Sequence, residues 1–232
     1  MTVYPPAGGI RPAMVVIDMQ NGFLDPASPL CIRMARETVP ACAAALEEAR
    51  RRKIPVIYAC RQYRADGSDV EHTRYHRWAE APALTPGSTG PLSEEIPASI
   101  APRPGDYQLV KPRFSAFFHT ELDLLLRRLQ VNTVVLLGTT TPNCIRTSCY
   151  DAISLEYNVA ILTDCCSSNT PEIQQANLAD MANIGAVLLD SDTFIREGLS
   201  LRDTSREASL AALSSDQLPG EDIFPAAEEE TL

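Results

Sequence analysis

The stretch Thr133–Asp151, TVVLLGTTTPNCIRTSCYD, decides the fold of this chain. Its first residues, Thr133–Leu137, are β-branched or aliphatic without interruption, which is the pattern of a strand buried on both faces. Gly138 ends this predicted strand, and a helical pattern follows with Cys144 in its first turn. The amide groups at a helix N-terminus favour the thiolate, which is the nucleophilic form of cysteine. A small buried residue at a strand–helix junction would look the same, so a catalytic Cys144 needs independent partners.

The rest of the chain alternates short apolar runs with helical patterns. We predict strands at Ala13–Asp18, Pro55–Cys60, Tyr107–Lys111, Thr133–Leu137, Val159–Thr163 and Ala186–Leu189. We predict helices at Thr38–Arg52, Leu122–Leu129, Asn143–Tyr157 and Pro171–Ile184, with a shorter one around Val70–Ala81. Strands that alternate with helices in this way form parallel sheets. The expected fold is therefore α/β, a three-layer, Rossmann-like domain with a six-stranded parallel sheet and helices on both faces.

Two segments depart from this alternation. Arg61–Pro104 is long, polar and rich in proline, glycine and serine, and a loop of this length in a compact domain usually covers or builds a site. Residues 199–232 contain eight carboxylates, two arginines and few aromatic residues. Such a segment cannot bury enough apolar surface to order itself. We therefore predict a domain over residues 1–198 and an acidic, weakly ordered tail over residues 199–232.

Composition and charge exclude several classes of partner. The formal net charge is −10, and −6 of it falls in the tail. Nucleic acids and anionic membranes bind basic surfaces, so neither is expected here. No apolar run approaches the roughly 20 residues of a membrane-spanning helix, and the N-terminus lacks the layout of a signal peptide. We expect a cytoplasmic protein whose seven cysteines are reduced thiols.

Three reactive side chains lie at the ends of predicted strands. Asp18 ends the first strand, Lys111 ends the third, and Cys144 follows the fourth. In an open parallel sheet the ligand binds beyond the carboxyl ends of the strands, so these side chains should meet at one edge. Together they offer a nucleophile, a base and a positive charge that stabilises a thiolate. This placement supplies the partners that Cys144 needs.

Three motifs that contain these residues resemble those of the isochorismatase-like cysteine hydrolases. The motifs are DMQNGF at Asp18–Phe23, KPRFSAF at Lys111–Phe117 and GTTTPNCIRTSCYDA at Gly138–Ala152. They occur in the family's order, and the resemblance extends over roughly residues 10–198. It implies the same six-stranded parallel sheet and an assembly into homodimers or homotetramers.

The resemblance also implies a catalytic triad of Asp18, Lys111 and Cys144. Asp18 would take the thiol proton, and Lys111 would stabilise the thiolate that attacks an amide carbonyl. Water would then hydrolyse the resulting thioester with Asp18 as the base. The family pattern further implies a cis peptide bond between Thr139 and Thr140. It places an oxyanion hole at the backbone N–H groups of Thr140 and Cys144.

The segment after the second predicted strand bears on the substrate. Nicotinamidases of this family carry a metal-binding Asp-x-His pair there, with a further histidine, whereas this chain reads CRQYR at Cys60–Arg64. His72 and His76 have a helical spacing that can hold zinc, but no third ligand is evident. We therefore expect neither a metal nor another cofactor. The Arg61–Tyr63 stretch is more similar to the carbamoyl and ureido hydrolases.

These features predict a metal-independent cysteine amidohydrolase that cleaves the C–N bond of a small linear amide or ureido compound. A nicotinamidase-type amidase, an isochorismatase-type vinyl-ether hydrolase and a non-catalytic member that binds a metabolite or a partner protein stay open as alternatives. Arg61 and Arg64 could each bind a substrate carboxylate through two hydrogen bonds. The candidates for substrate contact follow the first two strands and are Asn21, Phe23, Arg61, Gln62 and Tyr63.

Overall fold

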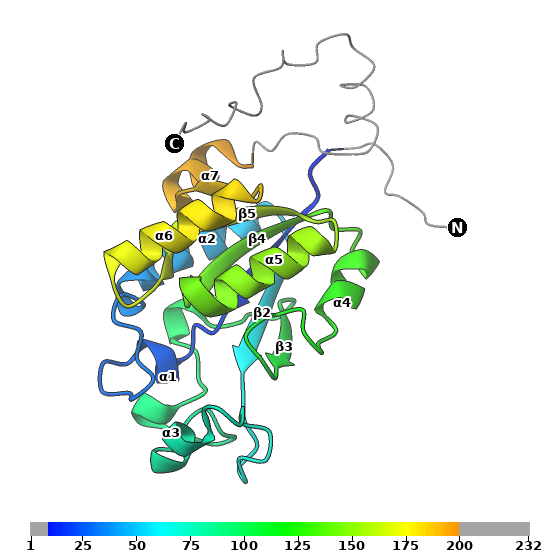
Figure 1. The fold of residues 1–232 in the computed structure, drawn as a ribbon. Helices are drawn as coiled ribbons and strands as arrows, with labels where there is room; N and C mark the ends of the chain where they lie inside the picture. Colours follow the sequence, from blue (N-terminus) through cyan, green and yellow to red (C-terminus); the bar gives the residue numbers. More distant parts are fainter. Residues whose placement is uncertain (1–8, 200–232) are drawn as a thin grey trace, which may run out of the picture. The chain divides into compact units, whose positions relative to one another are not determined.

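A computed structural model describes residues 9–199 and shows one six-stranded sheet (Figure 1). All strand pairs are parallel, and the strand order is β3-β2-β1-β4-β5-β6. The predicted α/β fold with a six-stranded parallel sheet is confirmed. The strands are β1 Pro12–Ile17, β2 Val56–Arg61, β3 Tyr107–Lys111, β4 Thr133–Thr139, β5 Asn158–Ser167 and β6 Val187–Leu189.

Helices cover both faces of this sheet (Figure 1). Alternate residues of each strand point to opposite faces, so one strand contributes to two cores. In β1, Val15 and Ile17 pack with α4, α5 and α6, whereas Met14 and Val16 pack with α2 and α7. The helices are α1 Asn21–Leu24, α2 Val39–Arg51, α3 Tyr75–Glu80, α4 Leu122–Arg128, α5 Arg146–Ser154, α6 Pro171–Asn183 and α7 Ser191–Glu197.

Two of the central strands extend further than predicted. Gly138 does not end β4, which continues through Thr139, and β5 continues to Ser167. Past a register shift, Gly138 pairs with Cys166 and Thr139 pairs with Ser167. The polar residues of these extensions pair as strand because the backbone of the neighbouring strand satisfies their hydrogen bonds. The sheet therefore reaches the threonine turn itself.

The helix predicted to begin at Asn143 has a different start. A π-helical turn, Thr141–Ile145, precedes α5 and contains Cys144. Short π-helical segments within helices occur frequently at functional sites. The nucleophile candidate thus lies on a distorted turn between β4 and α5.

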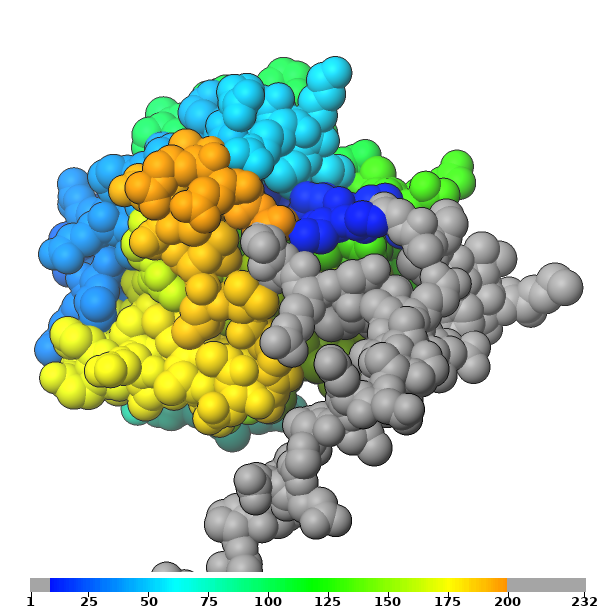
Figure 2. Space-filling view, turned by 90° about the horizontal axis from the view of Figure 1, so that it is seen from above, coloured from blue at the N-terminus to red at the C-terminus, as the bar shows by residue number. Residues whose placement is uncertain are grey.

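Two helices are absent from the predicted elements: the single turn α1 and the longer α7. Helix α7 packs on α2, beside which it lies in the space-filling view (orange in Figure 2). The Arg52 guanidinium lies 5.8 Å from the centre of the Phe194 ring and donates a 2.9 Å hydrogen bond to the carbonyl of Ile195. The side chain of Asp190 caps the N-terminus of α7 by accepting a hydrogen bond from the N–H of Thr193 at 2.6 Å.

The predicted tail, residues 199–232, lies outside the described residues except for its first position. Across the described range, 9–199, no helix is long and apolar enough to cross a membrane.

Candidate active site

The three strand-end side chains meet at the carboxyl edge of the sheet. Nζ of Lys111 lies 2.7 Å from Oδ2 of Asp18 and 3.5 Å from Sγ of Cys144. Asp18 and Lys111 are at most 1% exposed, and Cys144 is 6% exposed. Asp18 follows β1 and Cys144 follows β4, so they flank the position at which the strand order changes direction. Ligands of open α/β sheets bind at this position.

The backbone at Asp18 adopts a left-handed conformation with φ 53°. Residues other than glycine rarely occupy this region, and they do so mostly where surrounding structure imposes it. The N–H of Asp18 donates to the carbonyl of Ala59 on β2 at 3.1 Å, which helps to fix the turn. The carboxylate is thereby directed away from β1 toward Lys111.

Burial decides the protonation of Cys144. It raises the pKa of the Cys144 thiol to about 11, although attraction to Lys111 lowers it and the charge of Asp18 raises it further. In the protein without substrate, burial therefore outweighs the attraction of the thiolate to Lys111. At neutral pH the sulfur carries its proton, and attack on a carbonyl requires a base.

Asp18 is the carboxylate beside this thiol. Its ion pair with Lys111 is close, yet neither carboxylate oxygen accepts a well-directed hydrogen bond from any described residue. A buried carboxylate oxygen without a donor is costly unless a proton reaches it from elsewhere. The thiol of Cys144 is the neighbouring group with a proton to give.

The threonine turn is held against β5. The peptide bond between Thr139 and Thr140 is cis. The hydroxyls of Thr140 and Thr141 donate to the carbonyl of Ser167 at 3.2 and 3.0 Å, and the Ser167 hydroxyl donates to Oγ1 of Thr139 at 3.1 Å. These bonds fix the backbone that leads to the π-helical turn.

A cavity of about 550 Å³ opens onto the triad. Asp18, Thr139, Thr140 and Cys144 form its floor, so both predicted oxyanion residues line it. The segment Arg61–Pro104, which we call the covering segment, forms much of the opposite wall. Its lining residues include Arg61, Tyr63, Val70, Arg74, Arg77, Trp78, Glu80, Ala81 and Leu84, and other segments add Phe23, Leu30, Cys31, Phe114, Asn143 and Asn169.

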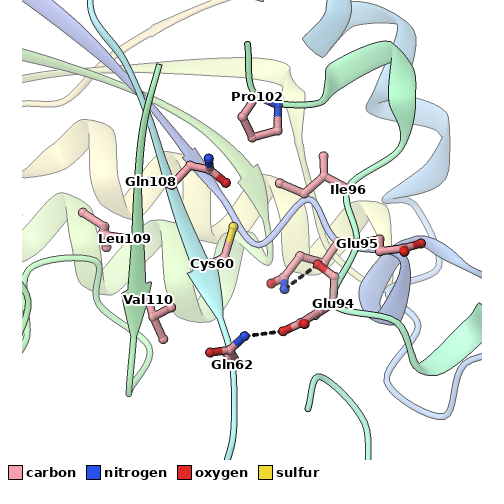
Figure 3. A pocket seen from close by; sticks show the side chains of 10 residues that line it. Cys60, Gln62, Glu94, Glu95, Ile96, Pro102, Gln108, Leu109 and Val110 are labelled. Carbon is pink, nitrogen blue, oxygen red and sulfur yellow. Dashed lines mark hydrogen bonds between the residues drawn. The ribbon is translucent and has the colours of Figure 1, made fainter. Parts of the chain in front are cut away.

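Of the predicted substrate contacts, Phe23, Arg61 and Tyr63 line this cavity and Asn21 and Gln62 do not. Successive residues of an extended chain point to opposite sides, so Gln62 faces away from its two neighbours. Gln62 lines a separate cavity of about 480 Å³, where its amide donates to the carboxylate of Glu94 (Figure 3). Asn21 begins α1, and its N–H donates to the carbonyl of Glu95 at 2.8 Å.

Arg61 forms a buried ion pair that the sequence did not indicate. Its Nη1 donates to Glu71 at 2.6 Å, and the Tyr63 hydroxyl donates to the other carboxylate oxygen at 2.9 Å. Burial alone would lower the pKa of Arg61, but attraction to Asp18 and other nearby groups raises it, so the guanidinium stays charged. A fixed positive charge therefore lies near the triad in addition to Lys111.

Several lining residues had no assigned role in the sequence analysis, notably Arg74, Arg77 and Phe114. The spacing of Arg74 and Arg77 was a usable signal, because residues three apart share one side of a helical turn. Arg74 immediately precedes α3 and Arg77 lies within it. Phe114 follows Lys111 closely in the same motif and reaches the cavity from the β3 side.

Metal ligands do not gather anywhere in residues 9–199. That range contains no cluster of three His, Cys, Asp or Glu side chains able to hold an ion. His72 and His76 are both exposed, and only His76 lies within α3. All seven cysteines are free thiols.

Comparison with known proteins identifies relatives of this chain. Residues 12–193 match the model of the isochorismatase domain. A protein of Arabidopsis thaliana named "Probable inactive nicotinamidase" is 39% identical over 176 residues, which cover 75% of this chain and 89% of that protein. The ureidoacrylate amidohydrolase of Azorhizobium caulinodans is 30% identical over 179 residues, 70% of this chain and 79% of the enzyme.

A solved structure has the same fold. The isochorismatase family protein of Desulfovibrio vulgaris is 40% identical and superposes with a TM-score of 0.76, covering 80% of this chain and 97% of that one. The residues that match the isochorismatase domain, 12–193, contain all three motifs of the site.

Proposed function

Because the chain belongs to the isochorismatase family of hydrolases, we propose that it cleaves the C–N bond of a small linear amide or ureido compound with Cys144 as nucleophile. The observation that carries this proposal is the contact of Lys111 with both Asp18 and Cys144 at the floor of a cavity. A binding protein would have no use for a thiol, a carboxylate and an ammonium group buried together, because each charge costs free energy to desolvate.

The proposed reaction begins with proton transfer from the Cys144 thiol to Asp18 as sulfur attacks the substrate carbonyl. The carbonyl oxygen gains the negative charge, and the N–H groups of Thr140 and Cys144 stabilise it. Collapse breaks the C–N bond and expels ammonia or an amine, which takes the proton from Asp18. Water then attacks the thioester, Asp18 accepts a proton from it, and the acid leaves as the thiol re-forms. Lys111 holds the carboxylate of Asp18 in place through both halves.

The substrate class rests on the covering segment and on the relatives. The segment lacks the Asp-x-His pair of metal-dependent nicotinamidases, and the Azorhizobium relative is named for hydrolysis of ureidoacrylate. A cavity of about 550 Å³ is roomy enough for a linear substrate of this kind.

Ammonia release from a panel of linear amides, carbamoyl amino acids, ureidoacrylate and nicotinamide tests the proposal. We expect turnover of at least one linear compound by the wild type and its loss in Cys144→Ala, with an unchanged circular dichroism spectrum. Cys60→Ala, whose side chain lines the other cavity, is the matched control and should keep full activity. Full activity in Cys144→Ala would refute the mechanism.

The Arabidopsis relative is named as a probable inactive nicotinamidase. The second candidate function is therefore a pocket that binds a metabolite without hydrolysing it. That alternative would be favoured if the wild type bound a panel member, by calorimetry, and released no ammonia from any of them.

A further inference from the structure

The covering segment brings an excess of positive charge to the cavity that opens onto the triad. The guanidinium-bearing residues Arg61, Arg74 and Arg77 line it. The overall charge of the chain is strongly negative, so this local excess runs against the composition of the protein. The three arginines differ in whether a carboxylate of the protein neutralises them.

Arg61 has such a partner. Its ion pair with Glu71 is 2.6 Å long, and both side chains are at least nine-tenths buried. Nη1 also donates to the carbonyl of Pro112 at 3.2 Å. A buried guanidinium with a buried carboxylate is electrically neutral as a pair, so Arg61 has little charge left for a substrate.

Arg74 has no such partner. Among the described residues its side chain forms neither an ion pair nor a hydrogen bond, although it is half-buried. Its guanidinium lies 5.5 Å from the centre of the Phe114 ring, and that of Arg61 lies 5.4 Å from the same centre. Two cations therefore contact one ring while Glu71 compensates only one of them.

The position of Arg74 is fixed by structure on either side of it. Its N–H donates to the carbonyl of Glu71 at 2.8 Å, and its carbonyl accepts from the N–H of Trp78 at 3.1 Å. The cation–π contact with the Phe114 ring holds the guanidinium without using its N–H donors, which stay available to bind an anion. A positioned guanidinium with a free edge is the usual receptor for a planar carboxylate.

We propose that Arg74 binds a carboxylate of the substrate and makes the enzyme selective for amide or ureido acids over their uncharged counterparts. The inference rests on the proposed function for the site of the reacting carbonyl, which lies at Cys144. The carboxylate end of the substrate then points to α3 and the scissile end to the threonine turn. Arg77, on the exposed side of the same helix, draws anions toward the cavity mouth.

Binding to protein that cannot turn over tests this assignment separately from catalysis. In Cys144→Ala we expect N-carbamoylglycine to bind at least about tenfold more tightly than its uncharged amide, as measured by isothermal titration calorimetry. Adding Arg74→Gln to Cys144→Ala should abolish that preference, because the affinity for the acid falls and the affinity for the amide does not change. Arg74→Lys should keep part of it, because the charge remains and the paired hydrogen bonds are lost.

Arg64→Gln is the matched control. The sequence suggested Arg64 as a carboxylate ligand, but its side chain is exposed, lies outside the cavity lining and contacts Asp66 at 3.4 Å. Its replacement should leave the preference for the acid intact. Thermal unfolding of every variant checks that the fold is retained.

Three results would overturn the role of Arg74. They are equal affinity for the acid and the amide in Cys144→Ala, no binding of either compound, and a preference for the acid that survives Arg74→Gln. A different result would overturn hydrolysis alone: preference for the acid through Arg74 in a wild type that releases no ammonia from the panel. In enzyme that keeps Cys144, Arg74→Gln alone should raise KM for the acid with little change in kcat. A merely structural defect would instead lower kcat for both compounds.

Discussion

A Cβ atom on Gly138 would overlap the carbonyl oxygen of Ile17, the residue that precedes Asp18. Ile17 and Gly138 are register partners of β1 and β4, and Gly138 has φ 122°, a conformation that L side chains rarely adopt. The close approach of these two strands sets the distance between the base candidate and the turn that carries Cys144. Only glycine permits it.

Gly138→Ala should therefore damage both stability and activity. We expect the free energy of unfolding to fall by more than about 2 kcal/mol, because strain at φ adds to a clash with backbone. Catalytic efficiency should fall with it, because Asp18 moves relative to Cys144. Denaturant titration and ammonia release measure the two effects. Gly105→Ala is the control: φ is also positive there, at 100°, but nothing lies within 4 Å, so activity should be unchanged.

Lys111→Met should abolish activity and also destabilise the fold. It would leave the carboxylate of Asp18 buried without its counter-charge, a change that costs about 3–5 kcal/mol. Replacing both partners, as Asp18→Asn with Lys111→Met, should restore most of that stability and none of the activity. Additive losses of stability in the double variant would show that the two groups are not coupled.

Alkylation of Cys144 by iodoacetamide should be slow at neutral pH in the protein without substrate. Burial raises the pKa of this thiol to about 11. At pH values below this pKa, the thiolate fraction and the alkylation rate should rise about tenfold with each unit of increasing pH. Peptide mass spectrometry after timed labelling between pH 7 and pH 10 measures the rate. A rate that is already constant at pH 7 would mean that the thiolate is formed before substrate binds.

Glu71→Gln should remove a pH-dependent part of the stability. Burial raises the pKa of Glu71, but attraction to Arg61 and the hydrogen bonds that the carboxylate accepts from Arg61 and Tyr63 together outweigh burial and lower the pKa. A carboxyl group with a lowered pKa in the folded state stabilises the protein above its unfolded pKa of about 4.3 and loses that contribution as pH falls through the folded value. The wild type should therefore exceed the variant in unfolding free energy most clearly above about pH 5. The gap should narrow in acid, and a gap that is constant from pH 3 to pH 7 would contradict the pairing.

The parts of the site that depend on strand ends could be predicted from sequence. Uninterrupted apolar runs mark the buried parallel strands, and such strands bring Asp18, Lys111 and Cys144 to one edge. The alternation of side chains also explains why Gln62 lines a different cavity from Arg61 and Tyr63. The composition of this stretch does not show which way each residue points.

Other features depend on contacts that no local pattern records. The partner of Arg61 is Glu71, in a loop whose path is set by packing. The protonation of Cys144 depends on its burial, which outweighs the attraction to Lys111. Helix α7 is too short for periodicity to reveal, and only its cap at Asp190 and Gly198 after its end could have indicated it.

The covering segment has a small core of its own, in which Tyr63, Val70, Trp78, Ala83 and Leu84 are buried together. The Trp78 indole donates to the carbonyl of Ala83 at 3.1 Å, and any side chain on Gly67 would collide with the indole ring. This core is separate from the two that hold the helices to the sheet. Substitutions within this small core should therefore reshape the cavity wall while the packing of the helices on the sheet is retained.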